Sequence, residues 1–256
     1  GAGMQLMPYA KIYYNGLEVA PGVAKSTLTG NANALSLGAI MVNKDGERVV
    51  DEKGTGRSIV TVQSKSEGNQ LYLVMDEPTF KIFRDGIKNN GVSPAEVDAW
   101  LAKNGKGTPL FAHGKTLTEA AKNAGLNANN LVNTVKRYNG FVKAGKDKDF
   151  GRKPENMKAA ISDQGPYYIV EQKPRFATTM GSVLLSESLQ VLDKNGKPIG
   201  NLGCEERQKD KIIPLRPSLR FLRTSSYFAR ITMRKLRVPR RPVPGRSCQV
   251  LPDPPV

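Results

Sequence analysis

Few residues of this sequence could carry acid–base or metal chemistry. The one histidine, His113, stands in the polar segment 112–115, and a Ser-His-Asp triad or a multi-histidine metal site would have to be built around it. Its polar surroundings favour a solvated loop histidine. The acidic pairs Asp51–Glu52 and Asp76–Glu77 are adjacent in the chain rather than spaced around a shared site. We therefore expect them to be turn or helix-entry charges.

Cofactor fingerprints are also missing from the sequence. Neither a GxGxxG pattern nor a P-loop occurs in a strand–turn–helix context. The two cysteines, Cys204 and Cys248, are too far apart for a CxxC motif. We expect no metal site and no dinucleotide-binding unit within these residues.

The elements that must position any site begin with strands and hairpins. Residues 38–51 predict a hairpin around the turn 44–46, where Asp and Gly tolerate the backbone of a tight turn. Residues 70–75 and 165–172 predict buried strands, and residues 182–202 predict a hairpin that turns at 194–196.

Capping patterns predict three short helices between these strands. Ser93, Pro94 and Glu96 form a helix start with a capping box, Thr116 begins a second helix that stops at Gly125, and a third starts near residue 127. A further helix is expected to open at 76–79. The apolar faces of the three capped helices comprise Val97, Trp100 and Leu101; Leu117, Ala120, Ala121 and Ala124; and Leu131, Val135, Tyr138 and Val142. This order predicts an α+β domain rather than a doubly wound sheet.

The charge of +16 is unevenly distributed. Residues 1–200 contain 20 Lys and 6 Arg with a balance of +7, whereas the last 56 residues contain 3 Lys and 10 Arg with a balance of +9. This Arg- and Pro-rich composition, which begins after Leu202, is typical of out-of-frame or disordered sequence. Arginines interleaved with Phe221, Tyr227 and Phe228 leave open nucleic-acid or anionic-surface binding by this tail, although we expect no nucleic-acid partner.

No apolar run approaches the ~18 residues of a membrane span, and nothing indicates a compartment.

Four stretches give the sequence a family resemblance. Residues 3–8 (Gly-Met-Gln-Leu-Met-Pro) are similar to a Gln-x-His-Pro segment, and residues 38–46 to a Gly-Ala-Ile-x-Val-Asn hairpin. Residues 131–140 are similar to a Thr-Val-x-x-Tyr-Asn helix, and residues 174–181 to a crossing that reads Thr-Met-Gly-Gly. In this order the stretches resemble the substrate-capping (clamp) domain of the FAD-dependent fumarate reductase family, which includes flavocytochrome c enzymes and urocanate reductase.

The resemblance implies a two-domain enzyme in which a cap closes over a substrate held against FAD. A hydride passes between flavin N5 and an activated C=C bond, and an arginine on the cap transfers the proton. It implies that Thr179, Met180 and Gly181 approach the isoalloxazine ring, where a small residue lets backbone come close. The implied partners are the flavin-binding domain of the parent protein and a small enoate substrate.

Departures from the family pattern define the other site residues. Gln5, Met7 and Thr178 fall on the substrate side, with Met7 and Thr178 in place of family histidines. The catalytic arginine corresponds to Phe80, which leaves the neighbouring Lys81 and Arg84 as catalytic candidates. Two further departures are the segment 31–35 in place of Thr-Glu-x-x-Arg and Ser182 in place of the second glycine. The loss of these cations and donors favours a substrate other than fumarate.

The expected domains are a flavin-domain edge at 1–9, a substrate-capping domain at 10–173, a return into a flavin-domain hairpin at 174–202, and the tail at 203–256. We expect a fragment of an oxidoreductase whose FAD belongs to the intact parent and is not retained by this chain. The alternatives are a binder of nucleic acid or anionic surfaces that acts through the tail, and a non-catalytic interaction domain.

Overall fold

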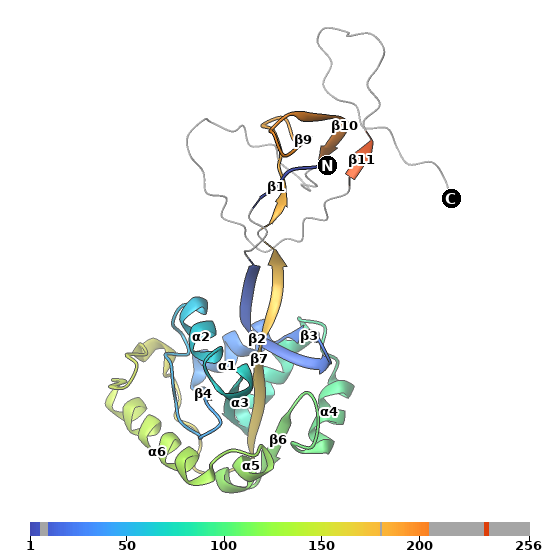
Figure 1. Ribbon diagram of the computed structural model, residues 1–256. Helices are drawn as coiled ribbons and strands as arrows, with labels where there is room; N and C mark the ends of the chain where they lie inside the picture. The colour runs from blue at the N-terminus through green and yellow to red at the C-terminus, as the bar shows by residue number, and fades with distance from the viewer. Residues whose placement is uncertain (6–9, 180, 205–232, 236–256) are drawn as a thin grey trace. The chain divides into compact units, whose positions relative to one another are not determined.

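The computed structural model describes residues 1–5, 10–179, 181–204 and 233–235 (Figure 1). The chain divides into two compact units. The larger is Ala10–Thr178, and the smaller combines Gly1–Tyr9 with Thr179–Val256.

A sheet with strand order β3-β2-β7-β5-β4 forms the centre of the larger unit, and β6 also pairs with β7. The pairings of β5 with β4 and β7, and of β6 with β7, are antiparallel, so that Leu73 faces Val170 and His113 faces Tyr168. This antiparallel pairing agrees with the expectation of a mixed fold that is not doubly wound. The strands are β2 (Ala10–Ala20), β3 (Val23–Ser26), β4 (Ile40–Val42), β5 (Leu71–Asp76), β6 (Phe111–Gly114) and β7 (Tyr167–Thr179).

Side-chain alternation along β5 explains why two cores form. Leu71, Leu73 and Met75 point into one apolar cluster, while Tyr72 and Val74 point into another. The first cluster takes in Leu35, Phe83 and Trp100 from helices, and the second takes in Ala120, Leu131 and Tyr138. The sheet is therefore covered by helices on both faces (Figure 1).

Caps fix where the predicted helices begin. Ser93 and Glu96 form the expected capping box, and the side chains of Asp76, Thr116 and Asn127 each accept a bond from a backbone amide in the first turn. The expectation of three small helices was too low, because the described residues contain six. They are α1 (Leu28–Leu37), α2 (Gly56–Gln63), α3 (Glu77–Lys88), α4 (Pro94–Lys103), α5 (Leu117–Asn123) and α6 (Ala128–Ala144).

The hairpin expected at 38–51 is only partly formed. β4 supplies one strand, and the returning chain makes a single bridge between Val42 and Arg48 around Gly46, whose φ is +76°. Beyond this bridge the chain turns inward with Arg48 and Glu52, which are both buried. The burial of these charges ends the second strand.

The smaller unit is described as short antiparallel strands. β1 (Met4–Gln5) pairs with β8 (Ser182–Val183), and β9 (Gln190–Leu192) pairs with β10 (Pro198–Cys204). The turn predicted at 194–196 is confirmed, since the Asp193 carboxylate accepts from the amides of Asn195 and Lys197 and Gly196 has φ +79°.

Within the predicted tail the structure describes one strand, β11 (Met233–Lys235), which pairs with β10. Arg234 lies in this strand, and the remaining expectations for the tail, including Phe221, Tyr227 and Phe228 and the other arginines after Cys204, lie outside the described residues. In the part of the chain that is described, no helix has the length and apolar character needed to cross a membrane.

Candidate functional site

The two longest strands of the larger unit, β2 and β7, lie next to each other in the sheet. Gly16 allows them to come close: a Cβ at this position would lie 2.8 Å from the Lys173 carbonyl oxygen and 3.0 Å from Cβ of Arg175. A larger residue would push the strands apart or displace the arginine. Gly16 thereby helps to place Arg175 against β2.

Arg175 is a half-buried cation held by two residues of β2. Its Nε donates to Oδ1 of Asn15 at 3.1 Å, and its guanidinium carbon lies 4.8 Å from the centre of the Tyr13 ring. Lys11 Nζ lies 5.1 Å from the centre of the same ring. Burial lowers the pKa of Arg175, and the Tyr13 side chain opposes this effect. No carboxylate of the described residues is within ion-pair distance of Arg175 or Lys11.

Buried side-chain amides lie beneath this arginine. Gln172 Oε1 accepts from Asn31 Nδ2 at 2.7 Å and from Thr27 Oγ1 at 3.0 Å, and Gln63 Nε2 donates to the Gln172 carbonyl oxygen at 2.7 Å. Asn15 and these four residues are all 0% exposed. Asn31 is the first residue of the segment that departs from the family pattern, and no sequence motif indicates that it is buried beside Gln172.

The catalytic candidates Lys81 and Arg84 both lie on α3 in surface ion pairs. Lys81 Nζ is 2.9 Å from Glu77, and Arg84 Nη2 is 2.8 Å from Asp98. Phe80 is buried and stacks on Tyr168 with ring centres 3.9 Å apart. The ion pairs of Lys81 and Arg84 and the ring stacking of Phe80 are structural contacts.

The structure places the remaining expected site residues at the end of β7 and in the smaller unit. Thr178 is exposed, and Thr179 is the last residue of β7. Gln5 Nε2 donates to Ser182 Oγ at 3.2 Å, and Gly181 is half-buried. Met7 and Met180 lie outside the described residues.

Arg57 was missed by sequence reasoning. Of the six arginines before Cys204, four (Arg48, Arg84, Arg137 and Arg152) are in ion pairs, and Arg175 is held by Asn15 and Tyr13. The exposed side chain of Arg57 has no carboxylate among the described residues. Thr55 caps α2, and the positive end of the helix dipole disfavours a cation in its first turn. Helix stability therefore gives no reason for an arginine at this position.

The prediction that Glu52 is a turn charge is wrong. Its carboxylate is fully buried and accepts from Arg48 Nη2 at 2.8 Å and from Arg152 Nη1 at 3.2 Å. Asp147 completes the cluster at 3.0 Å from Arg48. Arg152 also donates to the carbonyl oxygens of Leu35 and Ala39, so the cluster ties the end of α1 to the segment around 152. The charges balance in pairs, which indicates a structural role.

The prediction of a solvated loop position for His113 is also wrong. His113 belongs to β6, is half-buried, and lies with its ring 6.2 Å from that of Tyr168. The strand pairing of β6 with β7 fixes it there. The described residues contain no group of three or more side chains able to hold a metal ion.

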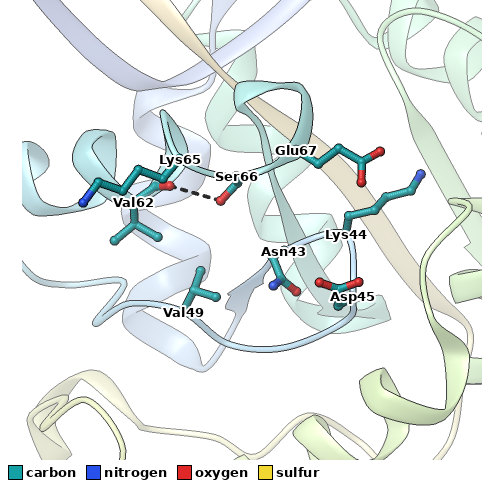
Figure 2. A pocket seen from close by; sticks show the side chains of 8 residues that line it. All are labelled: Asn43, Lys44, Asp45, Val49, Val62, Lys65, Ser66 and Glu67. Carbon is teal, nitrogen blue, oxygen red and sulfur yellow. Dashed lines mark hydrogen bonds between the residues drawn. The ribbon is translucent and has the colours of Figure 1, made fainter.

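A pocket of about 320 Å³ lies between the turn after β4 and the end of α2 (Figure 2). Asn43, Asp45 and Val49 line one side, and Val62, Ser66 and Glu67 line the other, with the Ser66 hydroxyl bonded to the Val62 carbonyl. Lys44 and Lys65 complete a lining in which both charge signs are present. This arrangement selects no particular ligand.

Binding of FAD requires a site for its pyrophosphate group. A pyrophosphate is usually bound at a glycine-rich turn before a helix, and the described part of the smaller unit contains no helix. The described part of the smaller unit therefore offers no pyrophosphate site of this kind, and no chemical step through FAD is derived from it.

Comparison with known proteins identifies the family. Residues 20–204 match the model of the FAD binding domain, and the chain belongs to this family. Its members in the oxidoreductase class include the fumarate reductases and urocanate reductases that the sequence resembles, so the family resemblance and FAD as the cofactor of the parent protein are confirmed.

Two relatives and one solved structure illustrate the similarity. The chain is 31% identical over 189 residues to the probable fumarate reductase Ifc3 of Shewanella frigidimarina, covering 73% of this chain and 29% of that protein. It is 33% identical over 170 residues to urocanate reductase of Eggerthella lenta, covering 64% and 25%. The open conformation of a flavocytochrome c3 fumarate reductase has a TM-score of 0.60 at 28% identity, over 78% of this chain and 31% of that chain. This chain thus spans less than a third of the length of these proteins.

Proposed function

We propose that the chain is the substrate-capping part of an FAD-dependent oxidoreductase that reduces an activated C=C bond. The match of residues 20–204 to the FAD binding domain family, with fumarate and urocanate reductases among the relatives, is the strongest support for the oxidoreductase class. The assignment as a cap rests on the order of the four sequence motifs. In this proposal the larger unit is the cap, close to the expected 10–173. The flanking residues 1–9 and 179–202 are edges of the flavin domain, and Thr179, Met180 and Gly181 approach the flavin ring.

The parent's flavin-binding domain holds FAD, which supplies the hydride when bound. The residues of this chain cover the substrate, exclude water and deliver a proton. We propose a substrate other than fumarate, because Met7 and Thr178 replace histidines that could bind a second carboxylate. An enoate with one carboxylate fits this smaller set of donors.

Three cations on the cap are candidates for the proton donor. Lys81 and Arg84 follow from the sequence, but each already has a carboxylate partner. Arg57 has none among the described residues and is exposed. An arginine that gives up a proton must regain one from solvent, and an exposed position on a helix end permits this. We propose Arg57 as the donor.

The experiment uses the complete parent protein with reduced flavin and compares acrylate, fumarate and urocanate as substrates. Acrylate reduction is expected to exceed fumarate reduction. Arg57→Gln is expected to lower kcat by roughly 10²–10⁴-fold, the usual contribution of a positioned proton donor. Arg84→Gln and Lys81→Gln test the other candidates in parallel.

If Arg84→Gln or Lys81→Gln lowers kcat in this range while Arg57→Gln does not, the donor assignment is wrong. If the parent reduces none of the three compounds, the enoate reductase proposal is wrong. Purification of the present chain alone provides a separate check, since we expect no stoichiometric flavin absorbance.

A further inference from the structure

Arg175 carries a positive charge that no carboxylate of the described residues neutralises. Removing a guanidinium from water is costly unless a carboxylate or several acceptors compensate for the loss of hydration. Arg175 is half-buried, and its one bond in the described residues is from Nε to Asn15. A partly desolvated charge without a counter-ion is typical of a binding or catalytic site.

The carboxylates nearest along the strands are already in use. Glu18 lies 2.7 Å from Lys173 Nζ, and Glu171, which accepts from the Glu18 amide, lies 4.0 Å from the same lysine. Burial raises the pKa of Glu171, which further reduces its value as a counter-ion. Both carboxylates therefore pair with Lys173, and Arg175 has no carboxylate counter-ion among the described residues.

The surroundings of Arg175 hold its side chain in one orientation. The guanidinium carbon lies over the Tyr13 ring, and Gly16 leaves room for the Cβ and Cγ atoms of Arg175 beside β2. Asn15 accepts from Nε, and the two terminal nitrogens, which have no partner among the described residues, can donate together to one anion. A guanidinium held in this way loses little entropy when it binds a planar oxyanion.

Two further donors strengthen the preference for an anion. Lys11 lies on the same Tyr13 ring and adds a second positive charge. The Arg175 bond fixes the Asn15 amide so that Oδ1 accepts, and the buried Nδ2 has no partner among the described residues. Both cations and the amide belong to the larger unit, so the site does not depend on the placement of the smaller one.

We propose that Arg175, held by Tyr13 and Asn15 and assisted by Lys11, binds the carboxylate of a small unsaturated monocarboxylate. This inference rests on the proposed function for the identity of the ligand as substrate. The guanidinium forms paired hydrogen bonds to the two carboxylate oxygens, and no covalent step is involved. Because these hydrogen bonds require a negative charge on the ligand, a neutral compound of the same shape should not bind.

The test is a titration of the full 256-residue chain with sodium acrylate at constant ionic strength, followed by ¹H–¹⁵N NMR. The Nε–H signal of Arg175, identified by its loss in Arg175→Lys, is expected to shift saturably with a Kd on the order of millimolar. The backbone amides of Tyr13 and Asn15 are expected to shift with the same Kd. Acrylamide, which is neutral and nearly the same shape, is expected to cause no saturable shift.

Arg175→Gln should abolish the saturable shift of the Tyr13 and Asn15 amides. Arg137→Gln, which removes the same charge from an exposed ion pair with Asp149, should leave it unchanged. The proposal is wrong if acrylamide shifts the same signals equally, if the shift survives Arg175→Gln, or if Arg137→Gln removes it. The titration needs no flavin, so acrylate binding can be measured even if the parent protein does not reduce enoates. Likewise, the reductase assay can be interpreted even if this chain alone does not bind acrylate.

Discussion

Arg48 and Arg175 are both removed from water, but their surroundings differ. Arg48 has carboxylates of Glu52 and Asp147 within 3.0 Å, and Glu52 is shared with Arg152. Burial lowers the pKa of Arg48, but these partners more than offset the effect and raise it above its ordinary value. Both arginines lie on aromatic rings, Arg48 on Tyr138 and Arg175 on Tyr13, but Arg175 bonds to an amide in place of a carboxylate, and its pKa is lowered. The first arrangement stabilises the fold, whereas the second keeps a cation ready for a ligand.

The largest expected loss of stability comes from breaking the buried cluster of Arg48, Glu52, Asp147 and Arg152. Glu52→Gln leaves Arg48 and Arg152 with Asp147 as their only carboxylate, and we expect the free energy of unfolding to fall by about 3–5 kcal/mol. Urea unfolding followed by fluorescence of the single tryptophan, Trp100, measures this in the larger unit.

Glu77→Gln is the matched control for this substitution, because it removes an exposed partner of Lys81. Its effect should stay within about 0.5 kcal/mol. A loss below 1 kcal/mol for Glu52→Gln would show that the buried carboxylate does not compensate the two arginines.

A smaller effect on stability is expected at Arg175. Arg175→Gln removes a desolvated charge together with its contacts to Tyr13 and Asn15, two changes that oppose each other. We expect unfolding free energy to change by less than about 1 kcal/mol, while Arg48→Gln lowers it by about 3 kcal/mol or more. Equal losses in the two variants would remove the distinction between the two arginines.

The smallest effect concerns the capping box of α4, where neither partner is deeply buried. The bond from Lys25, together with bonds from Ser93, lowers the pKa of Glu96 to about 2. Because the folded-state pKa is depressed, the stabilisation is present above the unfolded-state pKa of about 4.3 and is lost as the pH falls toward 2. The side chain is 35% exposed, so we expect about 0.5 kcal/mol or less.

Urea unfolding of wild type and Glu96→Gln at pH values across this window measures the contribution. The difference between them should shrink as the pH falls. A difference that stays constant or grows on acidification would contradict the assignment.

The sequence predicted local structure best where one residue's chemistry decides it. Ser93, Thr116 and Asn127 locate the starts of α4, α5 and α6 because each side chain satisfies a backbone amide. α1 was missed because Thr27 makes no side-chain cap and the segment is rich in small residues. α2 has only eight residues and begins with Gly56, which is a poor helix former.

The site was less predictable because it depends on contacts between distant segments. Glu52 resembles a turn residue in the sequence, and its burial depends in part on its contact with Arg152, 100 residues away. Arg175 looks like one of many basic residues until β7 pairs with β2 and places it on Tyr13 and Asn15. The family resemblance came from motif order, but motif order does not show which arginines are already in ion pairs.

The most direct test of the central claim is a single turnover of the complete parent protein. Its flavin is first reduced without oxygen, an excess of acrylate is added, and flavin absorbance is followed over time. We expect the oxidised flavin spectrum to return, and we expect Arg57→Gln to slow this return by at least roughly 10²-fold. A flavin that stays reduced with acrylate, fumarate and urocanate would contradict the assignment of this chain as the cap of an enoate reductase.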